Sequence, residues 1–184
     1  MVSPKMKQNG GYVSSMNSYN EKKNTFVRKQ LLNTLMEMLK EKRIEDIVIS
    51  DLIEKAGVGR VSFYRNYSSK EDILIQEERR LFQIWNDDYN ARNTNNDLDF
   101  NEELLNYYKN HSDFYLTLYN SGLESIIMNT IISSMKISED DANPVAYLKS
   151  SIAYMIYGWV HEWMKRGMQE SGTELSEMIR QAQK

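Results

Sequence analysis

The sequence predicts an all-α fold, in which a small N-terminal head of three helices is joined by a long helix to a helical C-terminal body. Apolar residues recur at helical spacing along most of the chain. The 184 residues include only 2 prolines and 8 glycines, and the alternating Val- and Thr-rich runs typical of strands are few. With 41% hydrophobic and 11% aromatic residues, the chain can form a folded globular core.

The composition argues against several functional classes. The chain has no cysteine, which excludes disulfides and thiol catalysis and suits the reducing cytoplasm. No apolar run approaches the roughly 20 residues of a membrane span, and Met1–Lys5 is not followed by the apolar segment of a secretory signal. His111 and His161 lie far apart, and no glycine-rich phosphate loop occurs. We therefore expect a cytoplasmic protein without enzymatic activity, cofactor, metal or membrane partner.

The N-terminal third divides into a tail and a helical head. Residues 1–22 are polar, rich in Asn, Ser and Gly, and without helical period, so we expect a flexible tail. A first helix is predicted from about Asn24 to Lys42, with the apolar stripe Val27, Leu31, Leu35 and Leu39. The head is placed at 23–70 and the body at 71–184.

Residues 49–67 are predicted to form two short helices joined by a glycine turn. Ser50 is placed to cap the first helix, and Gly57 ends it at a position where a left-handed backbone costs glycine little. Phe63 and Tyr67 are one turn apart in the second helix and are expected to face the core. Two short helices joined in this way, the second rich in polar and basic residues, are typical of a helix-turn-helix, whose second helix fits the DNA major groove.

Three runs follow one another in this region: SDLIEKAGV from Ser50, RVSFYRNY from Arg60 and SKEDIL from Ser69. Together they resemble the N-terminal DNA-binding domain of TetR/AcrR-type transcriptional regulators, over a span from about Thr25 to Leu81. Two positions depart from the family pattern, since Gly59 stands where serine is common and Val61 where glycine is common. The resemblance implies a dimer formed by the last two helices and an inducer pocket enclosed by the body.

The predicted second helix carries side chains suited to different parts of DNA. Arginine can bond guanine at two points and asparagine can bond adenine, while a phosphate contact is an equally open role for either arginine. Candidates for base edges are Arg60, Ser62, Arg65 and Asn66; candidates for phosphate are Ser50, Tyr64 and Lys70. Val61 presents methyl groups that can touch a thymine methyl.

The net charge of −3 is unevenly distributed along the chain. Residues 1–70 hold 13 Lys and Arg against 7 Asp and Glu, a net charge of +6. Residues 71–184 hold 10 Lys and Arg against 19 Asp and Glu, a net charge of −9. The positive end therefore coincides with the predicted helix-turn-helix, where it would attract phosphate.

The body is predicted to consist of further helices. A long helix over Lys70–Asn90, capped by Ser68 or Ser69, is expected to run from the head into the body. A loop is predicted at Asn93–Asp99. The remaining predicted helices are Glu102–Asn110, His111–Ser121, Leu123–Met135, Pro144–Met168 and Thr173–Gln183.

The helix predicted at 144–168 is apolar on two faces. One face carries Val145, Leu148, Ile152, Met155 and Trp159, and the other carries Tyr147, Tyr154, Tyr157, Val160 and Met164. We expect one side to meet its own core and the other to meet a partner subunit, so that the last two helices form a homodimer. Two recognition helices about one DNA turn apart would then read a palindromic operator in double-stranded DNA. The segment YGWVHEWMKRG from Tyr157 also resembles regulators with Tyr-Gly, Trp and Gly at this spacing.

Aromatic residues and methionine are concentrated in the body, where some are expected to line an apolar cavity for a small-molecule effector. Ordinary core packing is the alternative for each of them. The predicted ligand-binding residues are Trp85, Tyr89, Tyr108, Tyr115, Tyr119, Met128, Tyr154 and Trp159.

The sequence thus predicts a dimeric, sequence-specific DNA-binding regulator, a repressor released by a small apolar or aromatic ligand. In a first alternative, the body docks a protein partner and the chain is an activator or co-regulator. A closed cavity would favour the ligand, and a filled core with an exposed apolar patch would favour the protein partner. A second alternative is a helical enzyme with a vestigial head, which steep salt-dependent DNA affinity would contradict.

Overall fold

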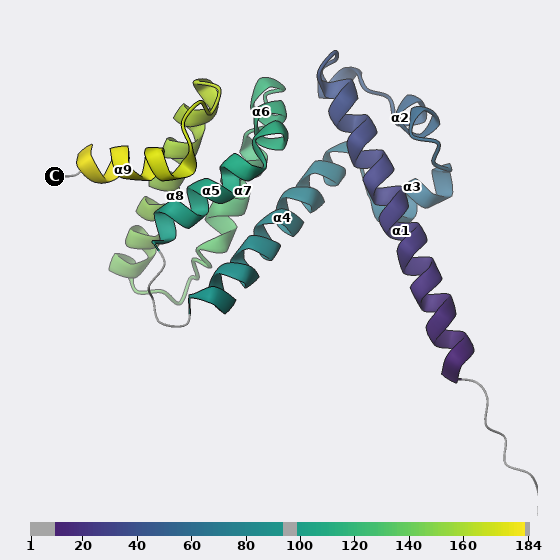
Figure 1. Cartoon of the computed structure of the whole chain (residues 1–184), viewed down its shortest axis with the longest axis horizontal. Helices are drawn as coiled ribbons and strands as arrows, with labels where there is room; N and C mark the ends of the chain where they lie inside the picture. Colours follow the sequence, from purple (N-terminus) through teal and green to yellow (C-terminus); the bar gives the residue numbers. More distant parts are fainter. Residues whose placement is uncertain (1–9, 94–98, 183–184) are drawn as a thin grey trace, which may run out of the picture.

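The computed structural model describes residues 10–93 and 99–182, and within them every regular element is a helix, which confirms the predicted fold class. Figure 1 shows a head of α1 to α3, a body of α5 to α9, and α4 running from one to the other. The elements are α1 (Gly10–Leu39), the 3-10 helix η1 (Ile44–Asp46), α2 (Ile49–Lys55), α3 (Arg60–Asn66), α4 (Lys70–Arg92), α5 (Phe100–Asn110), α6 (Ser112–Asn120), α7 (Ser125–Ser134), α8 (Asn143–Lys165) and α9 (Gly172–Ala182).

The first helix is longer than predicted, because α1 begins at Gly10 and not near Asn24. The tail predicted over 1–22 is therefore helical from Gly10, while residues 1–9 lie outside the described residues. Once a helix has formed, each added residue gains a hydrogen bond without repeating the cost of nucleation. Polar residues can therefore extend a helix whose later turns are held by buried Val27 and Leu31.

The head is held together by apolar side chains from α1, α2, α3 and the start of α4. Leu31, Leu35 and Leu52 are fully buried, and Phe63 meets them from α3 with no exposed surface. Tyr67 is also buried, as its spacing from Phe63 predicted. Burial of this kind stabilises the fold by about 1.5–3 kcal/mol for each large apolar side chain.

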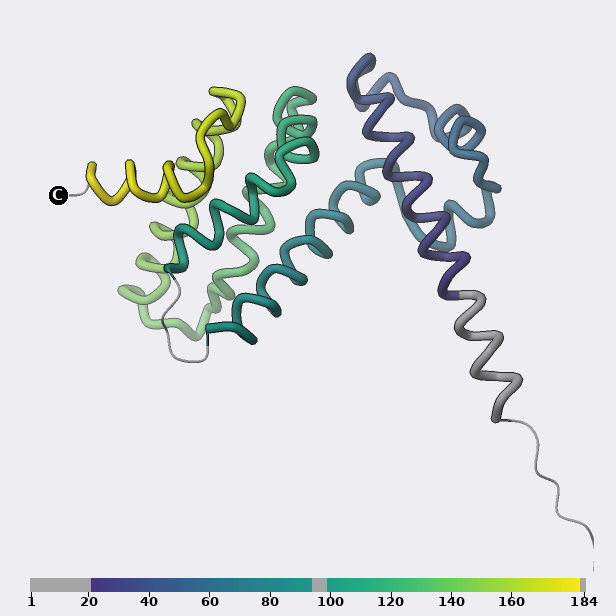
Figure 2. Tube along the Cα trace, viewed as in Figure 1, coloured from purple at the N-terminus to yellow at the C-terminus, as the bar shows by residue number. Residues whose placement is uncertain are grey.

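The long helix α4 begins at the predicted cap. The hydroxyl of Ser69 accepts a hydrogen bond from the backbone N–H of Asp72 at 3.1 Å, and a carboxylate oxygen of Asp72 accepts one from the backbone N–H of Ser68 at 2.9 Å. The chain trace in Figure 2 follows α4 from this cap to its end at the lower edge of the body. Because α1 contacts both α4 and α6, the head also touches the body directly.

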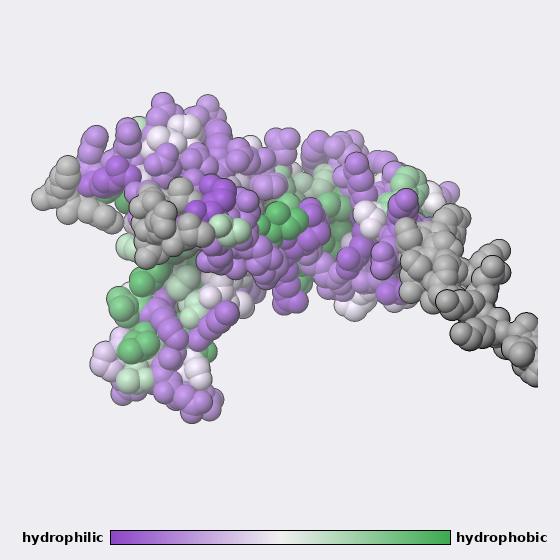
Figure 3. Space-filling model, turned by 60° about the horizontal axis from the view of Figure 1, so that its bottom comes forward, coloured by the Kyte–Doolittle hydropathy of each residue, from purple (hydrophilic) through white to green (hydrophobic). Residues whose placement is uncertain are grey.

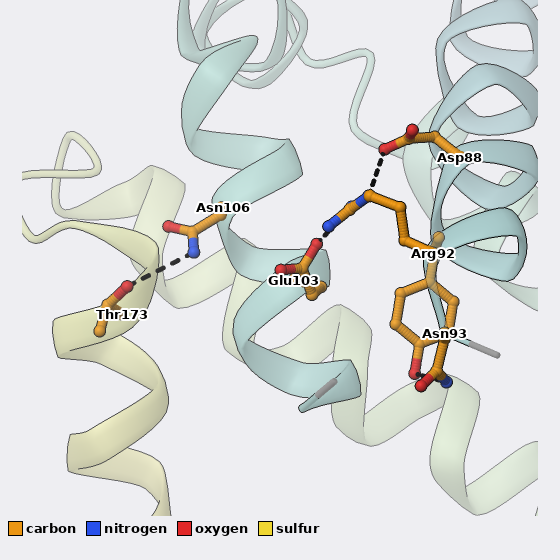
Figure 4. A network of polar contacts seen from close by, with 7 residues as sticks. Asp88, Arg92, Asn93, Glu103, Asn106 and Thr173 are labelled. Atoms are coloured by element: carbon orange, nitrogen blue, oxygen red, sulfur yellow. Dashed lines mark hydrogen bonds and ion pairs between the residues drawn. The ribbon is translucent and has the colours of Figure 1, made fainter. Parts of the chain in front are cut away.

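Polar contacts join α4 to α5 and α5 to α9 (Figure 4). At the end of α4, Arg92 bonds Asp88 at 2.9 Å and Glu103 of α5 at 2.6 Å. Asn106 of α5 donates to the hydroxyl of Thr173 in α9 at 3.4 Å. Most of the loop predicted between α4 and α5, residues 94–98, lies outside the described residues.

Helix α8 is buried along only part of its length. Its core-facing residues are Ala153, Ile156, Val160, Trp163 and Met164, and no residue of the helix before Ala153 is buried. The face predicted from Val145 to Trp159 is open or half-open, with Leu148 62% exposed. The second predicted face is divided, because Val160 and Met164 are buried while Tyr147 and Tyr154 are exposed. The reason is that the first half of α8 extends past the core, which Figure 3 shows as a lobe bearing apolar side chains at its lower left.

Candidate nucleic-acid interface

The turn between α2 and α3 is fixed by backbone hydrogen bonds. Gly57 has a φ of +63°, in the left-handed region predicted for it. The N–H of Gly57 donates to the carbonyl of Glu54 at 3.1 Å, and the N–H of Val58 donates to the carbonyl of Ile53 at 2.9 Å. This pair of bonds is the Schellman motif, which closes a helix and sets the direction of the next one. Gly59 then takes the N-cap position of α3.

Helix α3 has one buried face and one open face. Phe63 points into the head, whereas Val61 is 73% and Tyr64 50% exposed. Arg60 and Arg65 are exposed as well. Ser62 and Asn66, also predicted to contact DNA, are half-buried. We call the set Arg60, Val61, Ser62, Tyr64, Arg65 and Asn66 the α3 flank; Arg60, Val61, Tyr64 and Arg65 are its exposed members.

Two contacts within α3 hold side chains of the α3 flank in position. The guanidinium of Arg60 lies over the ring of Tyr64, 5.7 Å from its centroid. The side-chain amide of Asn66 donates to the backbone carbonyl of Ser62 at 2.8 Å. This bond engages one of the two amide hydrogens of Asn66, whereas the Arg65 side chain makes no hydrogen bond to any described residue.

The predicted capping role of Ser50 is wrong. The N-cap position of α2 is Val48, and the Ser50 hydroxyl donates to a carboxylate oxygen of Asp51 at 3.2 Å. The helix starts earlier than the local sequence indicated because Ile49 packs against the core and adopts helical geometry there. Ser50 remains exposed in the first turn of α2, although it caps nothing.

Lys70, predicted to contact phosphate, is engaged within the head. Its ammonium donates to the backbone carbonyl of Ile47 at 2.6 Å and to that of Glu45 at 3.4 Å. These bonds tie the start of α4 to the segment before α2. Lys70 therefore holds the helix-turn-helix in place in the structure, and its side chain is half-buried.

A groove of about 470 Å³ separates α1 from the α3 flank. Glu21, Lys23, Asn24 and Val27 line it from α1, opposite Ser62, Arg65 and Asn66 of α3. The first helix was predicted to start near Asn24, so no residue before it was among the predicted DNA contacts, although Lys23 lies beside the α3 flank. The basic pair at Lys22 and Lys23, next to the predicted helix start, was the available signal.

The aromatic residues predicted to bind a ligand fall into separate places. Trp85, Tyr108 and Tyr115 are buried together around Tyr107, with the rings of Tyr108 and Tyr115 4.7 Å apart. Tyr89 is half-buried and stacks on Trp85 at 5.6 Å. These rings pack against one another as core.

The other predicted ligand residues lie toward α8. Tyr119 contacts the ring of His161 at 5.4 Å, and Met128 and Trp159 are half-buried. Tyr154 is 55% exposed on α8. The eight residues thus lie on five helices, α4 to α8, and three of them, Trp85, Tyr108 and Tyr115, are buried.

Sequence reasoning missed one buried polar residue, Glu78. This carboxyl in α4 has no exposed surface and accepts a hydrogen bond from the Tyr115 hydroxyl at 2.8 Å. Burial raises the pKa of Glu78 to about 7, while the hydrogen bond from Tyr115 lowers it in part. The position could have been noticed, since Leu74, Glu78 and Leu81 share one helix face.

The described part of the chain holds neither a candidate metal cluster nor a candidate membrane span. No group of three His, Cys, Asp or Glu side chains there is placed to hold a metal ion. None of the helices in residues 10–93 and 99–182 combines the length and the hydropathy that crossing a membrane requires.

Comparison with known proteins assigns the chain to a family. A TetR-type family model, described as a transcriptional regulator C-terminal region, matches residues 95–184. The chain belongs to the TetR family of transcriptional regulators. This match covers the body, whereas the resemblance noted above lies in the head, so two separate parts of the chain agree on the TetR assignment.

A solved structure supports the fold of this TetR-family regulator. The crystal structure of Lin0861 from Listeria innocua, at 2.8 Å, superposes with a TM-score of 0.68 and 17% sequence identity. The likeness covers 96% of this chain and 94% of that chain. At 17% sequence identity, this similarity shows that the two chains share a fold. No curated protein matches the sequence.

Proposed function

We propose that this TetR-family regulator binds a palindromic operator in double-stranded DNA as a homodimer and represses transcription until a small ligand releases it. The observation that carries the proposal is the open α3 flank, a polar and basic surface on the second helix of a helix-turn-helix. Arg65 and Arg60 can donate two parallel hydrogen bonds to guanine or contact phosphate. The site binds DNA and catalyses nothing, and it acts in the cytoplasm.

The uneven distribution of charge along the chain supports DNA binding by the head. Residues 1–70 carry +6 and residues 71–184 carry −9. Phosphate is attracted to the first part and repelled by the second, which orients the molecule as it approaches a duplex.

The open face of α8 supports the dimer. Val145, Leu148 and Met155 are 44%, 62% and 42% exposed there, and Met178 of α9 is 53% exposed. Apolar side chains gathered on one lobe favour covering by another surface (Figure 3). A second copy related by a twofold axis would cover this face with the same face of its own, and would supply the second recognition helix.

Helix α4 would transmit the ligand signal. It runs from the capped end at the head into the body, where it packs against α7, and α1 of the head touches both α4 and α6. A ligand that prefers one position of α4 shifts the population toward that position and changes the separation of the two heads. The ratio of the ligand's affinities for the two states sets how far the affinity for the operator falls.

A second candidate function has one observation in its favour. The rings of Tyr107, Tyr108 and Tyr115 pack against one another in the core, while the apolar face of α8 is open. A filled core with an open apolar patch fits a body that docks another protein, which would make the chain an activator or co-regulator. The oligomeric state separates the two, since a stable homodimer through α8 would leave that face unavailable.

The test of DNA binding is a fluorescence anisotropy titration. A labelled duplex from the promoter region of the protein's own gene is compared with a scrambled duplex of equal composition. We expect affinity for the promoter to exceed affinity for the scrambled duplex by about 10³-fold or more, and to fall steeply as salt rises. Equal and salt-independent binding to both would contradict the proposal.

A further inference from the structure

We propose that an open groove between α4 and α7 is a binding site for a small amphipathic anion, a molecule with an apolar ring or chain and one acidic group. The groove has a volume of about 690 Å³, within the range typical of small-molecule sites. Its role as an effector site rests on the proposed function above, whereas the binding itself does not. None of the eight aromatic and methionine residues predicted above to bind a ligand lines it.

The floor of the groove is apolar. Ile75 and Phe82 line it from α4, and Ile126 lines it from α7. Phe82 is fixed from behind, because its ring packs against Trp85 at 5.4 Å and against Tyr107 at 6.3 Å. A flat or elongated apolar group placed here would meet a surface already held in position, so that little ordering is required on binding.

The charges of the groove are of one sign. Arg79 and Lys136 are both exposed and both line it, and no lining residue is acidic. Neither side chain makes an ion pair or a hydrogen bond to any residue that the structure describes. Other cations of the body are paired: Arg80 with Glu77, Arg92 with Asp88 and Glu103, and Lys149 with Asp141. Two unpaired cations in an acid-free groove, on a body of net charge −9, select an anion.

The backbone at Lys136 is a second observation that concerns this groove. Lys136 has a φ of +48°, in the left-handed region that a side chain enters at a cost of roughly 1–2 kcal/mol. It follows the C-terminal end of α7, and its carbonyl accepts a hydrogen bond from the ammonium of Lys149 at 3.2 Å. The left-handed turn closes the end of α7, where the N–H of Lys136 donates to the carbonyl of Ser133 at 3.2 Å, and the Lys136 side chain lines the groove.

The polar wall of the groove is able to donate to an acidic group. The side-chain amides of Asn86 and Asn129 and the hydroxyl of Ser133 line it, and within the described chain none of these three groups has a hydrogen-bond partner. They lie on α4 and on α7, so one acidic group can be held from both helices. An anion bound in this way would fix α4, the helix that connects body and head, against α7.

The probes for the test are 8-anilinonaphthalene-1-sulfonate and its uncharged analogue N-phenyl-1-naphthylamine, which differ in the sulfonate. Each is titrated against the full chain, and against Arg79→Gln, Lys136→Gly and the double variant, with fluorescence as the readout. Glycine removes the cation and adopts the positive φ without strain, so a weaker affinity in Lys136→Gly is not explained by damage to the fold. Lys165→Gln, an exposed change at the end of α8, is the matched control.

We expect each single variant to weaken sulfonate binding about tenfold, with Lys165→Gln and the uncharged analogue unaffected. The groove assignment is overturned if the double variant binds the sulfonate as tightly as the wild type, or if both probes bind alike. The effector role is read separately, from operator affinity with and without the sulfonate. Sulfonate binding that depends on Arg79 and Lys136 but leaves operator affinity unchanged supports the site and contradicts ligand release.

Discussion

The hydroxyl of Tyr115 donates a 2.8 Å hydrogen bond to the carboxyl of Glu78, and neither side chain has any exposed surface. Glu78 belongs to α4 and Tyr115 to α6, so this bond links the connecting helix to the body. The Tyr107 hydroxyl hydrogen-bonds to that of Tyr115. The second carboxyl oxygen of Glu78 has no partner among the described residues. A carboxyl group in this position is more stable neutral than charged.

Stability is expected to decrease as pH rises from about 5 to 8, through the titration of Glu78. Its pKa is about 7 in the folded chain against an ordinary value of 4.5, so the folded state binds more protons between these two values. The stabilisation is complete below 4.5 and lost as pH rises through 7, and it amounts to about 3 kcal/mol. Urea denaturation at several pH values, followed by circular dichroism, measures this change.

Glu78→Gln is the control for this prediction, because it keeps the shape of the side chain and removes the titration. Its glutamine oxygen can still accept from Tyr115. We expect the variant to be more stable than the wild type at pH 8 and to depend less on pH between 5 and 8. Parallel profiles for the two proteins would show that Glu78 does not titrate in this range.

Arg65→Ala is expected to weaken binding to the operator about 10- to 100-fold, because an exposed arginine on the α3 flank is lost. The free energy of unfolding should change by no more than about 0.5 kcal/mol, since the side chain contributes nothing to the core. Anisotropy titrations with the promoter duplex measure the affinity. Arg166→Ala is the control, an exposed arginine paired only with Glu162 beyond the end of α8. Equal losses in both variants would point to overall charge and not to the α3 flank.

Gly172→Ala is expected to destabilise the fold by about 1–3 kcal/mol. Helix α9 starts at Gly172, so close to α5 that an added Cβ would lie 2.4 Å from the backbone nitrogen of Asn106 and 2.6 Å from the carbonyl carbon of Leu105. Because these are backbone atoms, α9 itself must shift. Urea denaturation measures the loss, with Glu177→Ala on the exposed side of the same helix as control. Wild-type stability in Gly172→Ala would mean that α9 packs less closely on α5.

Leu148→Arg is expected to convert the dimer to a monomer without unfolding it, because Leu148 is 62% exposed in the single chain and would be buried between two copies. Sedimentation velocity measures the oligomeric state, and circular dichroism measures the fold. Gln169→Arg, exposed beyond the end of α8, is the control. A wild-type protein that sediments as a monomer would exclude the dimer and leave the α8 face to another partner.

Features decided by a few neighbouring residues were predicted well. The left-handed turn at Gly57, the cap at Ser69 and the inward spacing of Phe63 and Tyr67 all depend on local backbone geometry and helical period. The start of α2 was predicted wrongly, because Ile49 becomes helical through its packing against the core and not through the residues beside it. The start of α1 was predicted near Asn24, but the helix begins at Gly10. The reason is related, because the buried residues Val27 and Leu31 stabilise the helix from its later turns.

By itself, the sequence determined the all-α class, the helix-turn-helix and the concentration of positive charge at one end, because these follow from period, capping residues and composition. Only the tertiary structure decided which helical faces are covered. It packed the predicted ligand aromatics Tyr108 and Tyr115 into a filled core, buried Glu78 among them and left Arg79 and Lys136 unpaired beside a groove. The physical reason is that periodicity identifies an apolar face, whereas burial and pairing depend on residues distant in the chain that fold against it.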